Sequence, residues 1–394
     1  MGKLLSNPLF IYRALALAVT ILTMLGLVMV FSSSSVTLIS NGADPMYRLI
    51  AQGVAAIAGL AVAIPVVLFL TPKILTSKFV VYGSVTVVAA LLLAVLIVGT
   101  EINGSKSWIS IPGIPMTLQP SEFVKFVIAI ESGYFLGKKV RINNLKDFLM
   151  PAGFIFLAFC ALIMVEKDLG TASIVVIVTF VAYIIANTRW SVMATIFIPL
   201  ATAAGIFVAI EPHRLTRFTA FLTGCTDPQI AVCYQVIHAR YAFANGGLFG
   251  AGLGQSIAKW NYVPYADTDF IFSIIGEELG YIACVIIVIL FLLIMFCMIR
   301  IADYTADRVQ KIAIYAIIVY IPGQALLNIA VTLGIAPAIG IPLPLISGGG
   351  TSLIVSIVSI AFVLCCAKNS PPVKEMLGAT RGGIKKRVNA ARKA

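Results

Sequence analysis

The sequence predicts an all-α polytopic membrane protein with ten transmembrane helices, and its composition is the first reason. Of the 394 residues, 60% are hydrophobic and only 11% are charged, whereas soluble globular domains hold about 45–50% apolar and about 25% charged residues. The mean hydropathy of +1.03 agrees. These values exclude a soluble enzyme, a nucleic-acid binder and a disordered chain. The net charge of +12 therefore bears on membrane orientation instead of nucleic-acid binding.

Ten apolar runs approach the length of about 20 residues that a spanning helix needs. The fifth and sixth runs are separated only by the polar turn 166–168, and no small-residue cleavage site follows the first run, so we expect no signal peptide. The runs lie near 13–33, 48–71, 79–99, 119–137, 148–165, 169–186, 191–210, 269–299, 312–335 and 350–367.

The basic residues predict the orientation of these spans. Ten spans place both termini on one side, and most of the 28 Lys and Arg residues fall on that side, which makes it cytoplasmic. We expect a single transmembrane domain over 1–367 and a disordered basic tail over 368–394. The tail is expected to bind anionic lipid headgroups, with a partner protein as the alternative. One long extracellular loop, about 211–268, joins spans seven and eight, and its aromatic, Gly and Pro content favours a folded, functional loop.

Charged residues at the start of two spans are candidate functional residues, because ionisable groups within a membrane are costly. Glu122 and Lys125 are i, i+3 neighbours that can pair on one helix face, and both a structural pair and substrate contact stay open. Asp269 opens the eighth span, where Thr268 or Asp267 could cap the helix and the helix dipole would favour an acid.

Deeper in the eighth span, the adjacent acids Glu277 and Glu278 require a polar interior or basic partners. In the long loop, a Gly-rich run at 245–254 is a candidate anion-binding site or simply a tight turn. Polar and basic residues elsewhere in the loop favour the anion-binding interpretation; they are Arg214, Arg217, Gln235, Arg240 and Lys259.

The last external segment, 340–352, contains Pro and Gly residues that break helices. Non-helical backbone at membrane depth is tolerated only against protein or a wet cavity, so we expect a re-entrant turn that lines a site, with Ser347, Gly349 and Ser352 as candidates; an ordinary loop is the alternative. Cys225 and Cys233 in the long loop can form a disulfide in an oxidising compartment or remain free thiols. The 2 His residues are too few for a zinc site.

Taken together and in order, these segments resemble the SEDS family (shape, elongation, division and sporulation) from about residue 12 to 367. The stretches 258–262 and 276–280 look more like the family's division members than its elongation members. The segments that carry the resemblance are Asn-Gly-Ser-Lys-Ser-Trp at 103–108, Gln-Pro-Ser-Glu-Phe at 119–123 with Lys125, Glu-Lys-Asp-Leu-Gly-Thr-Ala at 166–172, the Tyr-Gln at 234–235 with the Gly-rich loop, Thr-Asp-Phe at 268–270, Gly-Glu-Glu-Leu-Gly at 276–280 and the Pro-Leu-Pro to Gly-Gly-Gly-Thr-Ser segment at 342–352.

The resemblance implies a peptidoglycan glycosyltransferase that polymerises lipid II for septal wall synthesis on the outer face of the bacterial cytoplasmic membrane. It implies a class B penicillin-binding protein and other divisome membrane proteins as partners. Asp269 matches the family's essential aspartate, which suggests a general base. Other positions that match family residues are Trp108, Glu122, Lys125, Arg214 and Arg217.

The chain departs from the family pattern at five positions, which are Lys167, His238, Tyr265, Asp267 and Gly348. The family usually has Pro, Gln, Glu, His and Tyr there. Asp267 adds a carboxylate beside Asp269 that could shift its pKa or help hold a divalent cation, Mg or Mn, although no closed metal-ligand set is visible. The competing functions are a lipid II flippase or other transporter, a non-enzymatic scaffold, and the elongation-type polymerase.

Overall fold

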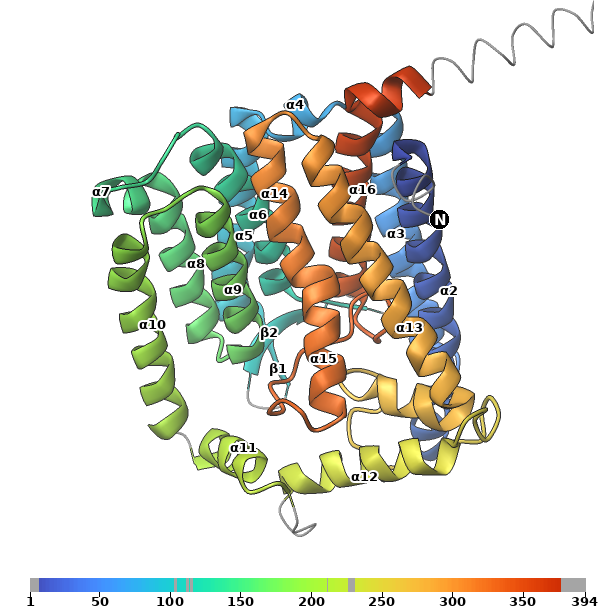
Figure 1. Cartoon of the computed structure of the whole chain (residues 1–394). Helices are drawn as coiled ribbons and strands as arrows, with labels where there is room; N and C mark the ends of the chain where they lie inside the picture. Colours follow the sequence, from blue (N-terminus) through green and yellow to red (C-terminus); the bar gives the residue numbers. More distant parts are fainter. Residues whose placement is uncertain are drawn as a thin grey trace, which may run out of the picture.

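The computed structural model describes residues 7–102, 105–110, 113, 116–210, 212–225 and 231–376, without the side chains of 102, 212–214, 231 and 232. It is a bundle of helices (Figure 1). Among the described residues, 8 helices are long and apolar enough to cross a membrane. They are α2 (Pro8–Ser40), α3 (Tyr47–Phe69), α5 (Lys78–Val98), the continuous segment α7 (Leu145–Phe148)–η1 (Leu149–Gly153)–α8 (Phe154–Val165), α10 (Trp190–Ile210), α13 (Ile271–Tyr304), the segment α14 (Arg308–Ile318)–η2 (Val319–Gly323)–α15 (Gln324–Thr332), and α16 (Gly350–Asn369).

Two further helices belong to the bundle. The apolar helix α9 (Leu169–Ile185) has 17 residues. Helix α6 (Pro120–Gly137) has 18 residues and carries Glu122, Lys125 and Glu131, all buried. Each of the ten predicted apolar runs overlaps one of these helical segments, although α2 extends five residues before and seven residues beyond the predicted run 13–33. A short helix, α4 (Pro72–Leu75), connects α3 to α5.

Helix starts follow local sequence signals. Asn7 accepts hydrogen bonds from the amides of Leu9 and Phe10 at the start of α2, where Pro8 occupies the first turn. Asp168 accepts the amide of Thr171 at the start of α9. Asp307 accepts the amide of Val309 at the start of α14. Short polar side chains at these positions satisfy amides that have no partner within the helix.

The two ends of the bundle differ. The described parts of the N- and C-terminal regions lie at one end. The opposite end carries α11 (Pro212–Leu222) and α12 (Ala231–Gly246), which lie across the bundle below α15 (Figure 1). We call this the loop end. Helix α10 reaches it apart from the main bundle, and only Val192 and Met193 of α10 are buried. The predicted loop 211–268 is therefore partly helical.

The all-α prediction is wrong in one respect, because a small antiparallel sheet closes the connection between α5 and α6. Its strands are β1 (Thr100–Ile102), β2 (Ser105–Ser110) and β3 (Thr117–Leu118), in the order β1-β2-β3. Thr100 pairs with Trp108, and Ile109 pairs with Leu118. The strands are only two to six residues long. Such short strands carry no long alternating pattern of apolar and polar residues, and each is stabilised by contacts with its neighbouring strand.

Helix α13 begins later than predicted and is interrupted. It starts at Ile271, and Phe270 at its N-cap makes no side-chain capping bond, so Asp269 lies in the preceding loop instead of the first turn. Gly280 has φ +80°, which breaks the helix. The loop 247–252 supplies the missing partners: the amides of Ala251 and Gly252 donate to the carbonyls of Glu277 and Glu278 at 2.8 and 3.0 Å.

Candidate active site at the loop end

Asp269 lies in the loop 265–270 that leads into α13, and its carboxylate faces the segment 339–349. A Cβ at Gly340 would lie 3.7 Å from Asp269 Oδ2, and Gly340 has φ +70°. That segment in turn packs on the start of α9, since a Cβ at Gly170 would lie 2.8 Å from the carbonyl oxygen of Ile339. Asp269 itself is half-buried. The candidate base therefore sits where α9, α13 and the 339–349 segment meet.

Burial and neighbouring charges make Asp269 a weaker acid than an ordinary aspartate. Burial raises its pKa, the charge of Arg217 lowers it, and Asp267 and Asp168 raise it, with the result that the pKa is about 6. A general base works best when its pKa lies near the working pH, because it must be ionised and still hold a proton well. Asp269 meets this condition.

We expect Asp267→Asn to move the acidic limb of the pH–rate profile to lower pH. A general base at Asp269 must be ionised, so the rate is expected to fall as the pH drops through its pKa. Asp267 raises that pKa, and its removal lowers it, so the variant retains activity at lower pH than the native protein. Initial rates across a pH series measure the shift. Asp44→Asn, in the turn between α2 and α3, is the matched control, and an unchanged limb in Asp267→Asn would contradict the prediction.

Three of the five departures from the family pattern lie in or against this loop, and they are Tyr265, Asp267 and Gly348. Asp267 Oδ2 forms an ion pair with Arg48 Nε of α3 at 3.5 Å. Gly348 donates its amide to the carbonyl of Asp267, and a Cβ at Gly348 would lie 2.9 Å from that oxygen. Tyr265 has φ +60°, and Lys167 has φ +62°, a value that the ring of a proline cannot adopt. The turn before α9 therefore takes a path here that a proline at this position would not allow.

The segment 340–349 is non-helical backbone packed against protein, as the re-entrant-turn prediction requires. A Cβ at Gly26 of α2 would lie 2.6 Å from the carbonyl oxygen of Leu345. Ser347 donates to the carbonyl of Thr268 at 2.6 Å and accepts the amide of Leu343 at 2.8 Å. Ser347 therefore holds the loop that contains Asp269. Gly349 is the N-cap of α16, and Ser352 is buried in its first turn.

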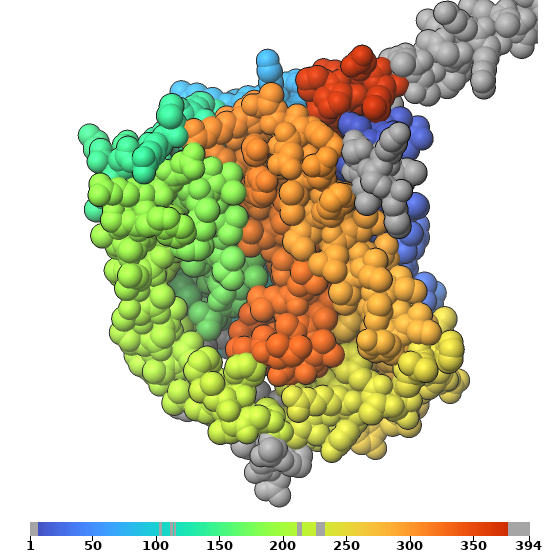
Figure 2. All heavy atoms as spheres, in the orientation of Figure 1, coloured from blue at the N-terminus to red at the C-terminus, as the bar shows by residue number. Residues whose placement is uncertain are grey.

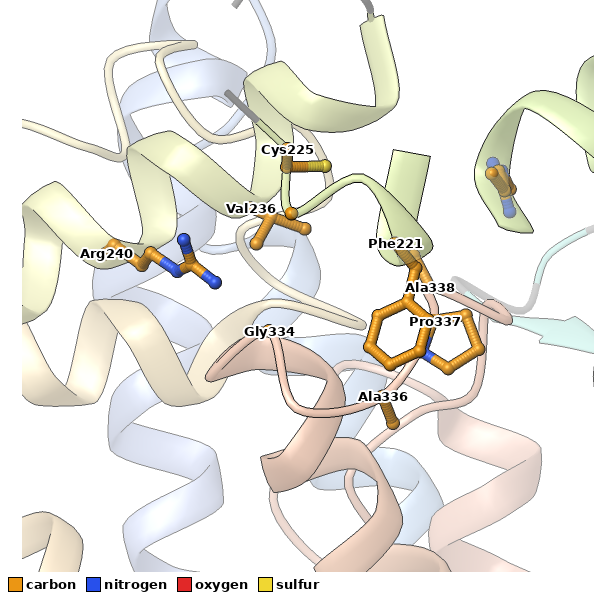
Figure 3. Close-up of a pocket in the computed structure, with 10 residues that line it drawn as sticks. Phe221, Cys225, Val236, Arg240, Gly334, Ala336, Pro337 and Ala338 are labelled. Atoms are coloured by element: carbon orange, nitrogen blue, oxygen red, sulfur yellow. The ribbon is translucent and has the colours of Figure 1, made fainter. Parts of the chain in front are cut away.

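A small pocket with two arginines lies beside α11 and α12. Its lining includes Arg217, Arg240, Cys225, Gly334 and Pro337, and Figure 3 shows Arg240 pointing toward Gly334 beneath Cys225. Within the described part of the chain, Arg217 Nε is buried and has no hydrogen-bond partner. An unpartnered guanidinium nitrogen beside a second arginine is suited to an anionic group.

Other predicted loop residues are placed differently. Arg214 belongs to α11, but its side chain lies outside the described residues. Gln235 is half-buried on α12. The ring of His238, also on α12, lies 3.9 Å from that of Tyr234. Figure 2 shows α11 and α12 forming the lower surface of the loop end, with the 333–345 region directly above.

Cys225 and Cys233 form a disulfide that links the end of α11 to α12, with Cα atoms 4.9 Å apart. Both residues are buried, in a small cluster with Ala220. We expect the unfolded, unreduced protein to show five free thiols, matching the other five cysteines, and seven after reduction. Thiol titration in denaturant measures both values. An equal count before and after reduction would exclude the disulfide.

Glu277, Glu278 and Lys259 hold the Gly-rich loop to α13. Lys259 Nζ lies 3.0 Å from Glu278 Oε1, with both side chains almost fully buried, and Ser32 of α2 donates to the same carboxylate. Glu277 accepts from Asn245 Nδ2 at 2.7 Å, from Ser256, and from the amides of residues 257 and 258 at 3.1 Å. Protein partners therefore occupy both carboxylates.

Glu122 and Lys125 form a buried ion pair at 2.8 Å, with 4% and 3% of their side chains exposed. Lys125 also donates to Gln324 Oε1 at 3.2 Å, and Gln324 donates to the carbonyl of Pro342 at 2.9 Å. The pair thus connects α6 to α15 and to the 339–349 segment. Trp108 is half-buried in β2, and its carbonyl accepts the hydroxyl of Thr100 at 3.1 Å.

Two acids near Asp269 were not among the predicted site residues. Asp168 Oδ2 accepts from Gln119 Nε2 at 2.9 Å and from Ser121 Oγ at 3.0 Å, so it ties α6 to α9. Glu166 is fully buried, and its carboxylate oxygens have no hydrogen-bond partner among the residues that the structure describes. Burial, and then Asp168, raise the pKa of Glu166 and the nearby Ser107 hydroxyl lowers it, with the result that the pKa is about 8. The sequence signal that could have identified Glu166 and Asp168 is their position in the short polar turn between two apolar runs.

Asp267 and Asp269 are the predicted metal candidates. Across the described ranges, no group of three or more His, Cys, Asp and Glu side chains lies close enough together to hold a metal ion. Two carboxylates do not complete the ligand set of a magnesium or manganese ion, which takes about six oxygen ligands. The protein alone therefore does not provide a closed divalent-cation site at this loop.

Comparison with known proteins supports the resemblance. The family model described as "Cell cycle protein", covering FtsW, RodA and SpoVE, matches residues 13–371. A Trichlorobacter lovleyi protein named "Probable peptidoglycan glycosyltransferase FtsW" is 33% identical over 89% of this chain and 91% of its own length. Stage V sporulation protein E of Bacillus subtilis is 33% identical over 90% of this chain and 96% of its own.

Solved structures share the fold. A chain from a structure described as "Structural coordination of polymerization and crosslinking by a peptidoglycan synthase complex" superimposes with a TM-score of 0.71 at 24% identity, covering 90% of this chain and 97% of that chain. The rod shape determining protein RodA of Thermus thermophilus superimposes with a TM-score of 0.66 at 24% identity, covering 91% and 96%. The fold, the family match over most of the chain and the relatives above 30% identity together show that the chain belongs to the FtsW, RodA and SpoVE family of cell cycle proteins.

Proposed function

We propose that this protein is a peptidoglycan glycosyltransferase of the bacterial cytoplasmic membrane that polymerises lipid II for septal wall synthesis. The observation that carries the proposal is the half-buried carboxylate of Asp269, whose pKa is about 6 and is lowered by the positive charge of Arg217. Glycosyl transfer from a pyrophosphate donor needs a base and, for the leaving group, positive charge. Relatives named FtsW are designated peptidoglycan glycosyltransferases, which supports the same activity and the division role.

The ten helical segments are proposed to span the membrane, with both termini in the cytoplasm. The positive-inside bias supports this orientation, and the described regions at the two termini lie at the same end of the bundle. The loop end is then extracytoplasmic. Buried ion pairing and hydrogen bonding explain how the charged helix α6 can belong to the membrane bundle. The basic tail over 368–394 is proposed to bind anionic headgroups on the cytoplasmic side.

In the proposed reaction, Asp269 is the general base. It accepts the proton of the acceptor sugar hydroxyl, whose oxygen forms a bond to the anomeric carbon of the donor. The bond from that carbon to the pyrophosphate oxygen breaks, and its electron pair leaves with the polyprenyl pyrophosphate. Proton transfer by a positioned group typically contributes about 10²–10⁴-fold to the rate.

The arginine pocket is the proposed site for the leaving pyrophosphate. Arg217 and Arg240 supply positive charge where negative charge develops, and Arg217 Nε, buried without a partner in the described region, is free to donate. Arg214 is proposed to contribute from the same helix as Arg217. Gln235 of α12 and Trp108 of β2 are proposed to contact the sugar or peptide part of lipid II. A Mg or Mn ion would depend on the pyrophosphate for most of its ligands, so the steps above use only protein groups.

Buried candidates are proposed to support the site without contacting substrate. The carboxylates of Glu277 and Glu278 and the ammonium of Lys259 already have protein partners. Glu122 and Lys125 are likewise paired. Ser347, Gly349 and Ser352 belong to the segment that contacts the Asp269 loop or to the first turn that follows it. These groups fix the position of the segments that carry Asp269.

A class B penicillin-binding protein and other divisome membrane proteins are the proposed partners. A structural neighbour comes from a peptidoglycan synthase complex that coordinates polymerisation and crosslinking. A transpeptidase beside the loop end would receive the glycan strand as it forms. Elongation-type polymerisation stays the alternative within the family, because RodA shares this fold.

The test of the proposed function uses the native protein, purified with its transpeptidase partner and supplied with lipid II. We expect polymeric glycan from the complex and none from the partner alone. A parallel vesicle assay follows the movement of lipid II across a bilayer. Translocation of lipid II without polymer would establish the flippase alternative. If the protein yields neither polymer nor translocation, the scaffold role is the function that remains.

A further inference from the structure

The loop that carries Asp269 is held by three successive backbone carbonyls. The carbonyl of Asp267 accepts the amide of Gly348 at 2.8 Å. The carbonyl of Thr268 accepts the hydroxyl of Ser347 at 2.6 Å. The carbonyl of Asp269 accepts Nδ2 of Asn328 at 2.8 Å. Three consecutive peptide units thus have external donors, all from a part of the chain that lies about sixty residues or more further along.

The groups that donate to these three carbonyls are themselves held in place by further hydrogen bonds. Asn328 of α15 is 1% exposed and also donates to the carbonyl of Ile341 at 2.7 Å, so one amide group bridges the Asp269 loop and the 339–349 segment. The carbonyl of Ser347 accepts Gln52 Nε2 of α3 at 2.9 Å, and Gln52 is 3% exposed. Helices α3 and α15 therefore hold the 339–349 segment from two sides.

A buried amide in an apolar helix is costly unless its hydrogen bonds are specific. Asn328 donates both amide protons, one to the carbonyl of Asp269 and one to that of Ile341, whereas its Oδ1 is buried without a hydrogen-bond partner among the described residues. Positioning matters in catalysis, since a displacement of about 1 Å can reduce a rate by about 10²-fold.

We infer that Asn328, with Ser347 and the Gly348 amide, forms a clamp that positions Asp269, and that Asn328 is the positioning residue on which both halves of the clamp depend. The inference rests on the proposed function for its kinetic consequence, but its structural consequence can be measured without activity. Asn328 acts on the backbone of Asp269 and needs no contact with substrate.

The test compares Asn328→Leu with native protein in the full chain bound to its transpeptidase partner. Leucine has similar size and no charge, and it removes both donors. We expect kcat for lipid II polymerisation to fall by about 10–10²-fold while KM stays unchanged. We also expect faster amide hydrogen exchange in 265–271 and 341–348, where the Gly348 amide directly reports one of the clamp bonds.

Thr332→Val is the matched control, because Thr332 is a fully buried polar side chain on the same helix, and its hydroxyl donates to the carbonyl of Ile329 in the same helix. Ser347→Ala and Ser347→Thr form a second pair: Ala should repeat the kinetic defect, and Thr, which keeps the hydroxyl, should restore activity. This pair decides the question if Asn328→Leu fails to fold.

The pH profile adds a readout that a general loss of stability would not move. A loosened loop gives the Asp269 carboxylate more water, so its acidic limb should move from near pH 6 toward lower pH. The clamp is wrong if Asn328→Leu matches Thr332→Val in kcat, acidic limb and exchange. If the native complex makes no polymer, the proposed function fails, and the exchange data alone then support or overturn the clamp.

Discussion

Replacing Asp269 with Asn is expected to reduce glycan polymerisation by about 10²–10⁴-fold, the range that a general base contributes. Asparagine has nearly the same shape as aspartate but cannot accept the proton of the attacking hydroxyl. The backbone of residue 269, held by Asn328 at 2.8 Å, does not depend on the carboxylate. The loss should therefore appear in kcat for lipid II polymerisation, with the purified complex as the enzyme and the native complex as reference.

The control for Asp269→Asn is the same substitution at the neighbouring acid, Asp267. Asp267→Asn removes a carboxylate two residues away in the same loop, and at a pH well above the pKa of Asp269 it should retain most of the native rate. Asp269→Asn should also lose the acidic limb that native protein shows near pH 6. Polymerisation by Asp269→Asn at the native rate would remove Asp269 from the role of base and leave the family membership untouched.

The positions of the helices follow from local sequence, because a run of about 20 apolar residues has few alternatives in a membrane. This information located every helical segment, but not the full length of α2, which extends beyond the predicted run 13–33 at both ends. It could not locate the sheet formed by β1, β2 and β3, whose strands are too short to leave an alternating pattern. It also placed the start of α13 at residue 269, because the apolar pattern begins there, whereas the loop bonds to the 339–349 segment delay the helix until Ile271.

The site shows the same division between local and distant information. The family resemblance pointed to Asp269 and Arg217, and the Pro and Gly residues pointed to the 340–352 segment. Neither signal gave a hydroxyl partner for Glu278, because Ser32, whose hydroxyl donates to that carboxylate, lies 246 positions away in the chain. Asn328 was not predicted, although the two amides of this apolar span, Gln324 and Asn328, are themselves signals of specific interactions. Which groups these amides bind can be decided only in three dimensions.

Lys125→Met is expected to destabilise the folded protein by about 3–5 kcal/mol, because it leaves the carboxylate of Glu122 buried without its cation. Only 4% of the Glu122 side chain is exposed, and the two groups lie 2.8 Å apart. The variant also removes the donor to Gln324, which connects α6 to α15. Thermal or denaturant unfolding in detergent measures the loss. Lys311→Met is the exposed control: its pair with Asp303 spans 3.9 Å with both side chains about two-fifths exposed, and it should change stability by about 0–1 kcal/mol.

The double variant Glu122→Gln with Lys125→Met separates the two roles that the sequence left open for this pair. If the pair is structural, removal of both charges should recover much of the stability lost in Lys125→Met, because no buried charge remains unpaired. Polymerisation at a temperature where the double variant is folded should then return as well. If stability returns while lipid II use remains abolished, the pair contacts the substrate. If Lys125→Met alone is as stable as native protein, the buried pair does not hold α6 against α15.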